Sequence, residues 1–359
     1  MTPTAALRDA GQSLWLDNIT RDLLDGGTLA RYVAELSVTG LTSNPTIFDH
    51  AIKQSRTYDA AIRAGVEAGR TGESLFFDLA LDDLGRAADL FRPVYERTSG
   101  VDGWVSLEVS PLLAYDTAAT IAAARQLHAR AGRPNLFIKI PGTREGLPAI
   151  EEAIYAGVPV NVTLLFSREQ YLAAAEAWLR GVERRIADGL DPDVASVASL
   201  FISRWDVAVS KLVPAGLVNT LGVAIGRRTW LAYRELTGSP RWQRAANFGA
   251  RPQRLLFAST GTKDPAAPDT LYVGALAAPL TVNTMPEATL KAWADHGALA
   301  GTIPADGGDC ERVIEAHLAA GVDVDALGAR LQQEGADAFV KSWHELMGVI
   351  GARASALGG

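Results

Sequence analysis

Short β-favouring runs alternate with longer segments of helical pattern along this chain. Such alternation is typical of parallel α/β proteins, in which each strand is followed by a helix that covers the sheet. The β-favouring runs are residues 13–18, 38–44, 104–109, 135–143, 158–165, 194–201, 254–260 and 280–284. Eight strands in a chain of 359 residues predict a single (β/α)8 TIM-barrel domain that spans residues 1–359.

Helical patterns fill several of the segments between these runs, at 21–36, 117–131, 145–155 and 169–186. Two longer segments, 47–98 and 205–247, exceed one barrel helix each, so we expect helical insertions there. The first insertion is expected to contain two or three helices. Residues 286–357 predict a C-terminal helical segment, which a turn at 305–309 and Gly321 interrupt.

Composition argues against several classes of function. A net charge of −7 and a pI near 5.4 give no support for a nucleic-acid partner or an anionic membrane surface. The longest uncharged apolar segment, 271–286, contains prolines, threonines and an asparagine, so no membrane span is expected. The N-terminus lacks an apolar signal core and Cys310 is the single cysteine, which favours a cytoplasmic location. The five histidines are dispersed, so we expect no metal site.

The fourth run places one lysine inside an apolar sequence. Strand side chains alternate between two faces, so Leu136, Ile138 and Ile140 point one way while Phe137 and Lys139 point the other. Burying an ammonium group costs several kcal/mol unless the group is paired or loses its proton. One interpretation is a lysine that attacks a substrate carbonyl to form a Schiff base. The other is a strand-end lysine that reaches solvent or pairs with a carboxylate.

The alternation of side chains also predicts which other groups share the interior of the barrel. One face of each strand packs on helices, and we take the aliphatic positions as that face, including Leu164, Leu256 and Ala258. The polar side chains that then point inward are Asp17, Thr42, Asn44, Ser106, Glu108, Lys139, Asn161, Thr163, Ser199 and Ser259. Most of them lie late in their strands. Because barrel active sites sit at the C-terminal ends of strands, we expect these groups to converge on one pocket.

Each of these residues, taken singly, also has a structural explanation. Asp17 is a candidate N-cap of the next helix, Asn44 a turn residue before Pro45, and Thr163 a β-favouring filler. Inward polar groups at matching heights on several strands are harder to explain in that way. The pattern therefore favours the Schiff-base interpretation of Lys139.

The polar strand ends lie within longer motifs, at residues 15–18, 39–48, 106–111, 137–143, 160–167, 258–263 and 303–308. In this order the motifs resemble the signatures of the transaldolases, which are Schiff-base transferases of the class I aldolase superfamily. The resemblance covers nearly the whole chain and is closest to the longer bacterial branch. It implies a pentose phosphate pathway enzyme that transfers a dihydroxyacetone unit from sedoheptulose 7-phosphate to glyceraldehyde 3-phosphate. The products would be erythrose 4-phosphate and fructose 6-phosphate.

The resemblance also implies a role for each inward residue. Lys139 would form the Schiff base with the ketose, and Glu108 would serve the proton transfers of that step through a water held by Thr163. Asp17 would take the proton from the C4 hydroxyl as the C3–C4 bond breaks. The residues that would hold the sugar are Thr42, Asn44, Asn161 and Ser199. No metal or other cofactor is expected.

The residues that would bind the substrate phosphate depart from the family pattern. Arg204 matches the family's phosphate-binding arginine, and a guanidinium group grips phosphate well. The shorter bacterial enzymes have a second such arginine just after the seventh strand. In this chain Ser259 matches the residue next to that arginine, but Gly261 stands where the arginine itself would be. Lys263 is the candidate replacement, and the alternative is a solvated turn lysine.

Other functions stay open at this point. One is a Schiff-base aldolase that releases free dihydroxyacetone. It would share Lys139 and differ in whether the intermediate reacts with water or with an acceptor. Another is a non-catalytic sugar-phosphate-binding protein, against which the intact Lys139, Asp17 and Glu108 argue. A fusion with a sugar isomerase finds no room in the chain. We expect a monomer or a homodimer, and the 47–98 insertion is a candidate surface for a further partner.

Overall fold

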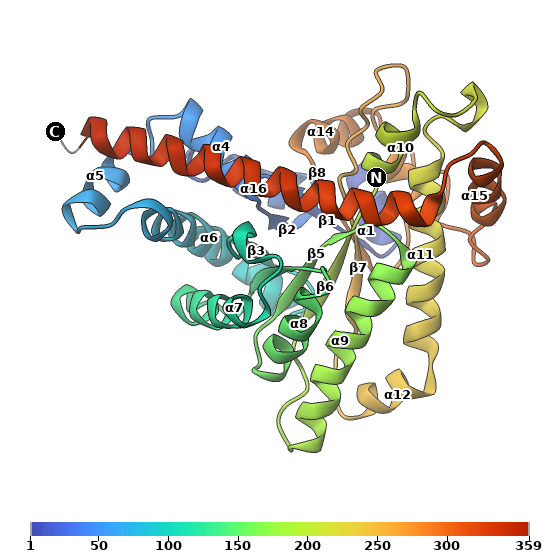
Figure 1. Ribbon diagram of the computed structural model, residues 1–359, viewed down its shortest axis with the longest axis horizontal. Coiled ribbons are helices and arrows are strands. Elements are labelled where there is room, and N and C mark those ends of the chain that lie inside the picture. The colour runs from blue at the N-terminus through green and yellow to red at the C-terminus, as the bar shows by residue number, and fades with distance from the viewer. Residues whose placement is uncertain (1, 358–359) are drawn as a thin grey trace.

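The computed structural model describes residues 2–357, and Figure 1 shows its strands surrounded by helices. The strands are β1 (Gln12–Asp17), β2 (Val38–Thr42), β3 (Val105–Glu108), β4 (Leu136–Pro141), β5 (Val160–Leu165), β6 (Ser196–Phe201), β7 (Arg254–Ala258) and β8 (Thr281–Met285). The helices are α1 (Pro3–Asp9), α2 (Arg21–Asp25), α3 (Thr28–Glu35), α4 (Pro45–Gln54), α5 (Asp59–Glu67), α6 (Gly72–Arg97), η1 (Pro111–Leu113), α7 (Thr117–Ala131), α8 (Gly146–Tyr155), α9 (Arg168–Ala187), α10 (Ser203–Val209), η2 (Ala215–Leu217), α11 (Leu221–Gly238), α12 (Pro240–Asn247), α13 (Leu271–Ala275), α14 (Glu287–His296), α15 (Cys310–Ala319) and α16 (Val324–Leu357).

The strands form one parallel barrel. Their order is β2-β1-β8-β7-β6-β5-β4-β3, and a parallel bridge between Gly40 and Trp104 joins the first strand of this order to the segment just before the last. The Leu41 amide donates to the Trp104 carbonyl at 2.9 Å across the same junction. A Cβ at Gly40 would lie 2.7 Å from that carbonyl oxygen and 2.8 Å from the Trp15 ring, so closure requires glycine here. The predicted (β/α)8 barrel is confirmed.

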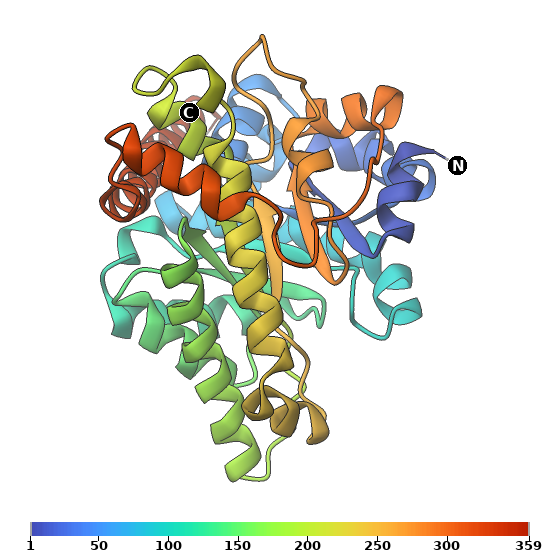
Figure 2. The same cartoon turned by 90° about the vertical axis from the view of Figure 1, so that its right-hand side faces the viewer.

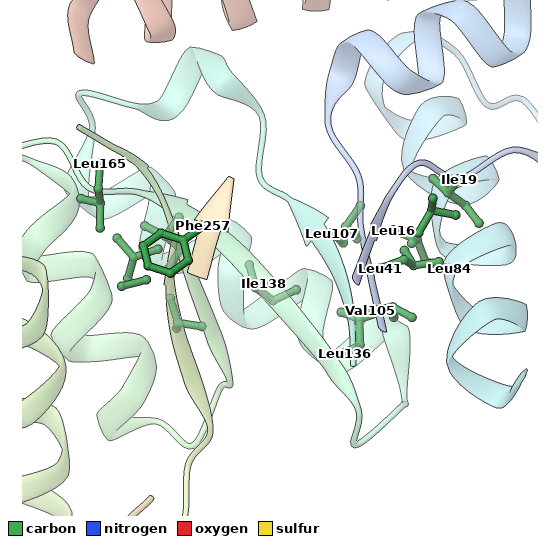
Figure 3. Close-up of a cluster of buried hydrophobic side chains, with 14 of the residues drawn as sticks. Leu16, Ile19, Leu41, Leu84, Val105, Leu107, Leu136, Ile138, Leu165 and Phe257 are labelled. Carbon is green, nitrogen blue, oxygen red and sulfur yellow. The ribbon is translucent and has the colours of Figure 1, made fainter. Parts of the chain in front are cut away.

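Two packed cores account for the alternation along the strands. Aliphatic side chains on the outer face, such as Leu16, Leu107 and Ile138, pack against the surrounding helices, and Figure 3 shows part of this cluster. Inside the barrel, Trp104 stacks on Phe137 with ring centroids 4.1 Å apart. Aromatic rings fill the interior at the level of Phe137, and the active sites of such barrels lie beyond this level, at the C-terminal ends of the strands.

The prediction for Leu164 is wrong. Leu164 belongs to the inner core and Leu165 to the outer one, where Figure 3 shows it. The cause is a β-bulge: the pairing of β5 with β6 shifts register between Val162 and Leu165, and Leu164 has a left-handed φ of 59°. The bulge reverses the alternation after Thr163.

The predicted orientation of the seventh strand is also wrong. Leu255 and Phe257 pack outward, while Leu256 and Ala258 face inward. The whole of β7 is buried, so its sequence contains no polar and apolar alternation to orient it. Ser259 nevertheless reaches the interior, because it follows the strand with a left-handed φ of 55°.

Most predicted helices are present, with two differences. The 21–36 segment forms α2 and α3, which separate at Gly26 and Gly27, and Gly27 has a left-handed φ of 68°. The short helices α1, η1 and α13 were not predicted. The first insertion forms α4, α5 and α6, and the second forms α10, α11 and α12, of which α11 and α12 are conspicuous in Figure 2. No helix within residues 2–357 is long and apolar enough to cross a membrane.

The C-terminal helix α16 lies across the C-terminal ends of the strands. Figure 1 shows it running from α15 past the barrel to α4 and α5. Its Ser342 hydroxyl lies 2.8 Å from that of Thr46, and Arg353 pairs with Asp59 at 2.6 Å. The 34-residue helix therefore links the first insertion to the mouth of the barrel.

Candidate active site

The buried lysine lies in a polar layer formed by neighbouring strands. The strand registers pair Glu108 with Lys139 and Lys139 with Asn161. Lys139 is 5% exposed; its Nζ donates to the Ser43 carbonyl at 2.9 Å and lies 3.4 Å from Glu108 Oε2. Lys139 therefore does not reach bulk solvent, and its partners are a carbonyl and a carboxylate.

Glu108 is only partly satisfied in this layer. Its Oε1 atom has no hydrogen-bond partner among the described residues, and neither does the buried Thr163 hydroxyl. Burial raises the pKa of the Glu108 carboxyl, and the nearby Lys139 ammonium opposes that rise. A carboxyl with a raised pKa and a free oxygen is suited to exchanging protons.

Asp17 lies at the end of β1, where a short hydroxyl chain holds it. Thr42 donates to Asp17 Oδ1 at 2.7 Å, and the Thr284 hydroxyl lies 2.7 Å from that of Thr42. Since the single Thr42 proton goes to Asp17, Thr284 is left to donate to Thr42. Burial raises the pKa of Asp17, and Lys139 is the strongest opposing influence. Asp17 is not an N-cap, because Thr20 caps α2.

Two amides complete the layer. Asn161 donates to Ser106 Oγ at 3.1 Å and accepts from Ser199 Oγ at 2.7 Å, which orients its side chain. Asn44 accepts from the Ile47 amide at 3.1 Å and is the N-cap of α4, not the turn residue that its sequence position suggested. It also lines the cavity, so one side chain can serve both purposes.

A cavity of about 260 Å³ opens above this layer. The predicted residues that line it are Asp17, Thr42, Asn44, Lys139, Thr163, Ser199, Arg204, Ser259 and Lys263. Glu108 and Asn161 lie outside this lining set, and each contacts a residue within it. The residues predicted from their positions in the strands thus gather at one place.

Two cations line the cavity. Arg204, at the start of α10, is partly buried and lies over the Phe201 ring at 5.3 Å; Lys263 is exposed in the loop after β7. Burial lowers the pKa of Arg204, and Glu334 opposes that change. Within residues 2–357 neither side chain has an ion-pair partner within 4 Å, so both charges are available to a ligand.

Several lining residues were not predicted. They are Thr46, Ile47, Phe201, Ala258, Gly261, Thr284, Pro286 and Phe339. Side-chain alternation along the eighth strand could have found Thr284, because Val282 and Thr284 share the inner face. Nothing local in the sequence marks Phe339, which comes from α16. No group of three or more His, Cys, Asp or Glu side chains within residues 2–357 is placed to hold a metal ion.

A buried lysine and glutamate, with a partly buried aspartate at the same cavity, lie at the mouth of a parallel barrel and define a (β/α)8-barrel enzyme. The family model described as "Transaldolase/Fructose-6-phosphate aldolase" matches residues 14–350. The chain therefore belongs to the transaldolase/fructose-6-phosphate aldolase family, as its motifs predicted.

Curated relatives agree with this assignment over nearly the whole chain. A protein named "Transaldolase" from Thermobifida fusca (strain YX) is 47% identical, and the match covers 96% of each chain. One of the same name from Arthrobacter sp. (strain FB24) is 46% identical over 99% of this chain and 98% of the relative. "Transaldolase 2" from Nostoc sp. is 40% identical over 95% and 94%. The predicted enzyme class, and sugar phosphates as its substrates, are confirmed.

Proposed function

We propose that this transaldolase carries out dihydroxyacetone transfer through a Schiff base on Lys139, with sedoheptulose 7-phosphate as donor and glyceraldehyde 3-phosphate as acceptor. The observation that carries the proposal is the position of Lys139, which is buried beside Glu108 and lines the same cavity as Asp17. Borohydride reduction with bound fructose 6-phosphate tests it, because reduction converts an iminium into a stable amine.

Schiff-base formation needs a nucleophile and a group that moves protons. Lys139 Nζ adds to the ketose carbonyl carbon, and the carbinolamine then loses its hydroxyl group as water. We assign these proton transfers to Glu108, acting through a water molecule shared with Thr163. The two unpartnered oxygens, Glu108 Oε1 and Thr163 Oγ1, support this assignment, because such buried groups usually bind water.

Bond cleavage needs a base at the other end of the bond. We assign it to Asp17, which accepts the C4 hydroxyl proton as the C3–C4 electron pair moves into the iminium. The Thr42 hydrogen bond fixes the carboxylate in place for this step. The aldose phosphate leaves, and the enamine on Lys139 attacks the carbonyl of the acceptor, to which Asp17 returns the proton. Hydrolysis of the imine frees the product.

Replacing Glu108 by glutamine is expected to slow Schiff-base formation by about a hundredfold, because an amide cannot carry the proton between steps. The side chain keeps its size, and it lies outside the cavity lining, so the dissociation constant of fructose 6-phosphate should stay nearly unchanged. Borohydride quenching at increasing times measures the rate of formation. Glu67→Gln, on the exposed side of α5, is the matched control. A wild-type rate in Glu108→Gln would assign the proton transfers to another group.

We further propose that Arg204 and Lys263 hold the substrate phosphate. Both side chains line the cavity, and neither has an ion-pair partner within residues 2–357, which supports this. A Cβ at Gly261 would lie 3.1 Å from Pro286 and 3.3 Å from Thr289, so the missing arginine would need α14 to give way. Lys263, two residues on, brings a charge to the same cavity.

Lys263→Ala is expected to raise the KM for fructose 6-phosphate about tenfold with little change in kcat, since an exposed charge contributes modestly to binding. Lys263→Arg should restore the KM, because the positive charge returns. Unphosphorylated fructose is the control substrate. An equal rise in the KM for fructose would show that Lys263 does not act on the phosphate. If neither KM changed, Lys263 would be a solvated turn lysine.

The location and the oligomeric state of the enzyme are also proposals. We place the enzyme in the cytoplasm, since it uses sugar phosphates and its single cysteine suits a reducing compartment. A monomer or a homodimer remains our expectation for its assembly.

A further inference from the structure

One side chain from α16 ties together the ends of the two strands that carry Lys139 and Thr163. The Gln332 amide nitrogen donates to the Gly142 carbonyl at 3.0 Å and to the Leu164 carbonyl at 2.9 Å. Gly142 directly follows β4, and Leu164 lies at the end of β5. A single NH2 group thus satisfies two carbonyls from neighbouring strands.

The strand ends need such a tie because β5 is irregular there. The left-handed Leu164 and the register shift that follows Val162 interrupt the regular ladder directly after Thr163. The hydrogen bond from the Gly142 amide to the Thr163 carbonyl, at 2.7 Å, is the backbone link between the two ends. Gln332 adds a second link one residue further on. A bulge beside an active site aims side chains, so holding its geometry has a direct effect on Thr163.

The same face of α16 is fixed against the site by two neighbouring turns. A Cβ at Gly335 would lie 3.0 Å from Leu164 Cδ2 and 3.2 Å from Arg204 Nη1, so the helix packs closely on both. One turn further on, Phe339 lines the cavity. Close packing therefore fixes the position of α16, and with it Gln332, relative to the strand ends.

We propose that Gln332 is a positioning residue for the Schiff-base step. It does not line the cavity, and it acts by holding the β4 and β5 ends so that Lys139 and Thr163 keep their relative placement. The inference rests on the proposed function, because it assigns Gln332 to the alignment of the nucleophile with the water-binding hydroxyl.

The test replaces Gln332 by methionine, which has similar length and no donor. We expect kcat per active site to fall about tenfold, since misplacement of reacting groups by less than 1 Å is costly. The KM for fructose 6-phosphate should change less than about twofold, because the Gln332 amide bonds to Gly142 and Leu164 and to neither Arg204 nor Lys263. The matched control is Gln333→Met, which alters the next side chain, an exposed one bonded to Asp337 and Tyr115. Its kcat should match the wild type.

Two further measurements separate positioning from a role in folding alone. Active sites are counted by the amount of lysine that borohydride can trap, so a loss of folded enzyme does not alter kcat per site. The loss of kcat caused by Gln332→Met should also be smaller in a Thr163→Val background, because Gln332 acts in part by positioning the Thr163 hydroxyl. Gln332→Glu, which keeps the shape and cannot donate, decides the matter if the methionine variant does not fold.

The outcomes distinguish this inference from the function it rests on. A wild-type enzyme that yields no trapped adduct overturns the Schiff-base proposal itself. An enzyme that is trapped normally, and whose Gln332 variants retain wild-type kcat per site, overturns only the positioning role. A fall in kcat that is the same with and without the Thr163 hydroxyl also contradicts it.

Discussion

Lys139→Met is expected to lower the rate of dihydroxyacetone transfer by about 10⁴-fold or more, because the variant has no nucleophile for the ketose carbonyl. Methionine fills much of the same space, and the outer core side chains Ile138 and Ile140 are untouched. The loss of the ammonium leaves Glu108 without its cation, and that carboxyl can take up a proton instead. We therefore expect the variant to fold, with its circular dichroism spectrum unchanged.

The measurement is the initial rate of glyceraldehyde 3-phosphate release from fructose 6-phosphate in the presence of erythrose 4-phosphate. Lys341→Met is the control, since Lys341 lies on the exposed side of α16 and the same substitution there should leave the rate unchanged. A folded Lys139→Met variant that turns over at a measurable fraction of the wild-type rate would remove Lys139 from the mechanism.

Asp17→Asn is expected to slow cleavage of the C3–C4 bond by about 10²- to 10⁴-fold while leaving Schiff-base formation largely intact. An amide cannot accept the C4 hydroxyl proton, although its oxygen can still accept the Thr42 hydrogen bond. The intact six-carbon adduct should therefore accumulate on Lys139. Mass spectrometry after borohydride reduction distinguishes it from the three-carbon adduct expected in the wild type.

The pH dependence gives a second readout for Asp17. The base must be ionised to accept a proton, and burial raises its pKa above the ordinary 3.8, with Lys139 opposing the rise. The wild-type kcat/KM should therefore fall, as the pH is lowered, at a value above 3.8. In Asp17→Asn this fall in kcat/KM should be absent, and any remaining pH dependence in the acid range should come from Glu108. A three-carbon adduct formed at the wild-type rate by the variant would assign the base to another residue.

The strand pattern predicted much of the site because most strands obey a strict alternation. Leu14 and Leu16 pack outward in β1, as do Leu136, Ile138 and Ile140 in β4. That regularity predicts Asp17 and Lys139 inside the barrel. The polar layer follows directly from the parallel registers, which set Glu108, Lys139 and Asn161 side by side.

Other parts of the site depend on features that alternation does not encode. The bulge at Leu164 and the left-handed Ser259 each reverse a side chain, and neither is glycine, the residue that usually marks such a conformation. Phe339 and Gln332 lie far along the chain from the strands they approach, on a helix whose docking is set by tertiary packing. Ser203, whose hydroxyl lies 2.9 Å from that of Ser259, was likewise not predicted.

The most direct test of the Schiff-base mechanism is to reduce the enzyme with borohydride in the presence of fructose 6-phosphate and to map the modified peptide. Aldose phosphate release is measured in parallel with and without erythrose 4-phosphate. We predict a reduced three-carbon adduct on Lys139 and turnover that requires the acceptor. An adduct on Lys139 with equal turnover in the absence of acceptor would indicate an aldolase that releases dihydroxyacetone. The absence of any adduct on Lys139 would contradict the mechanism.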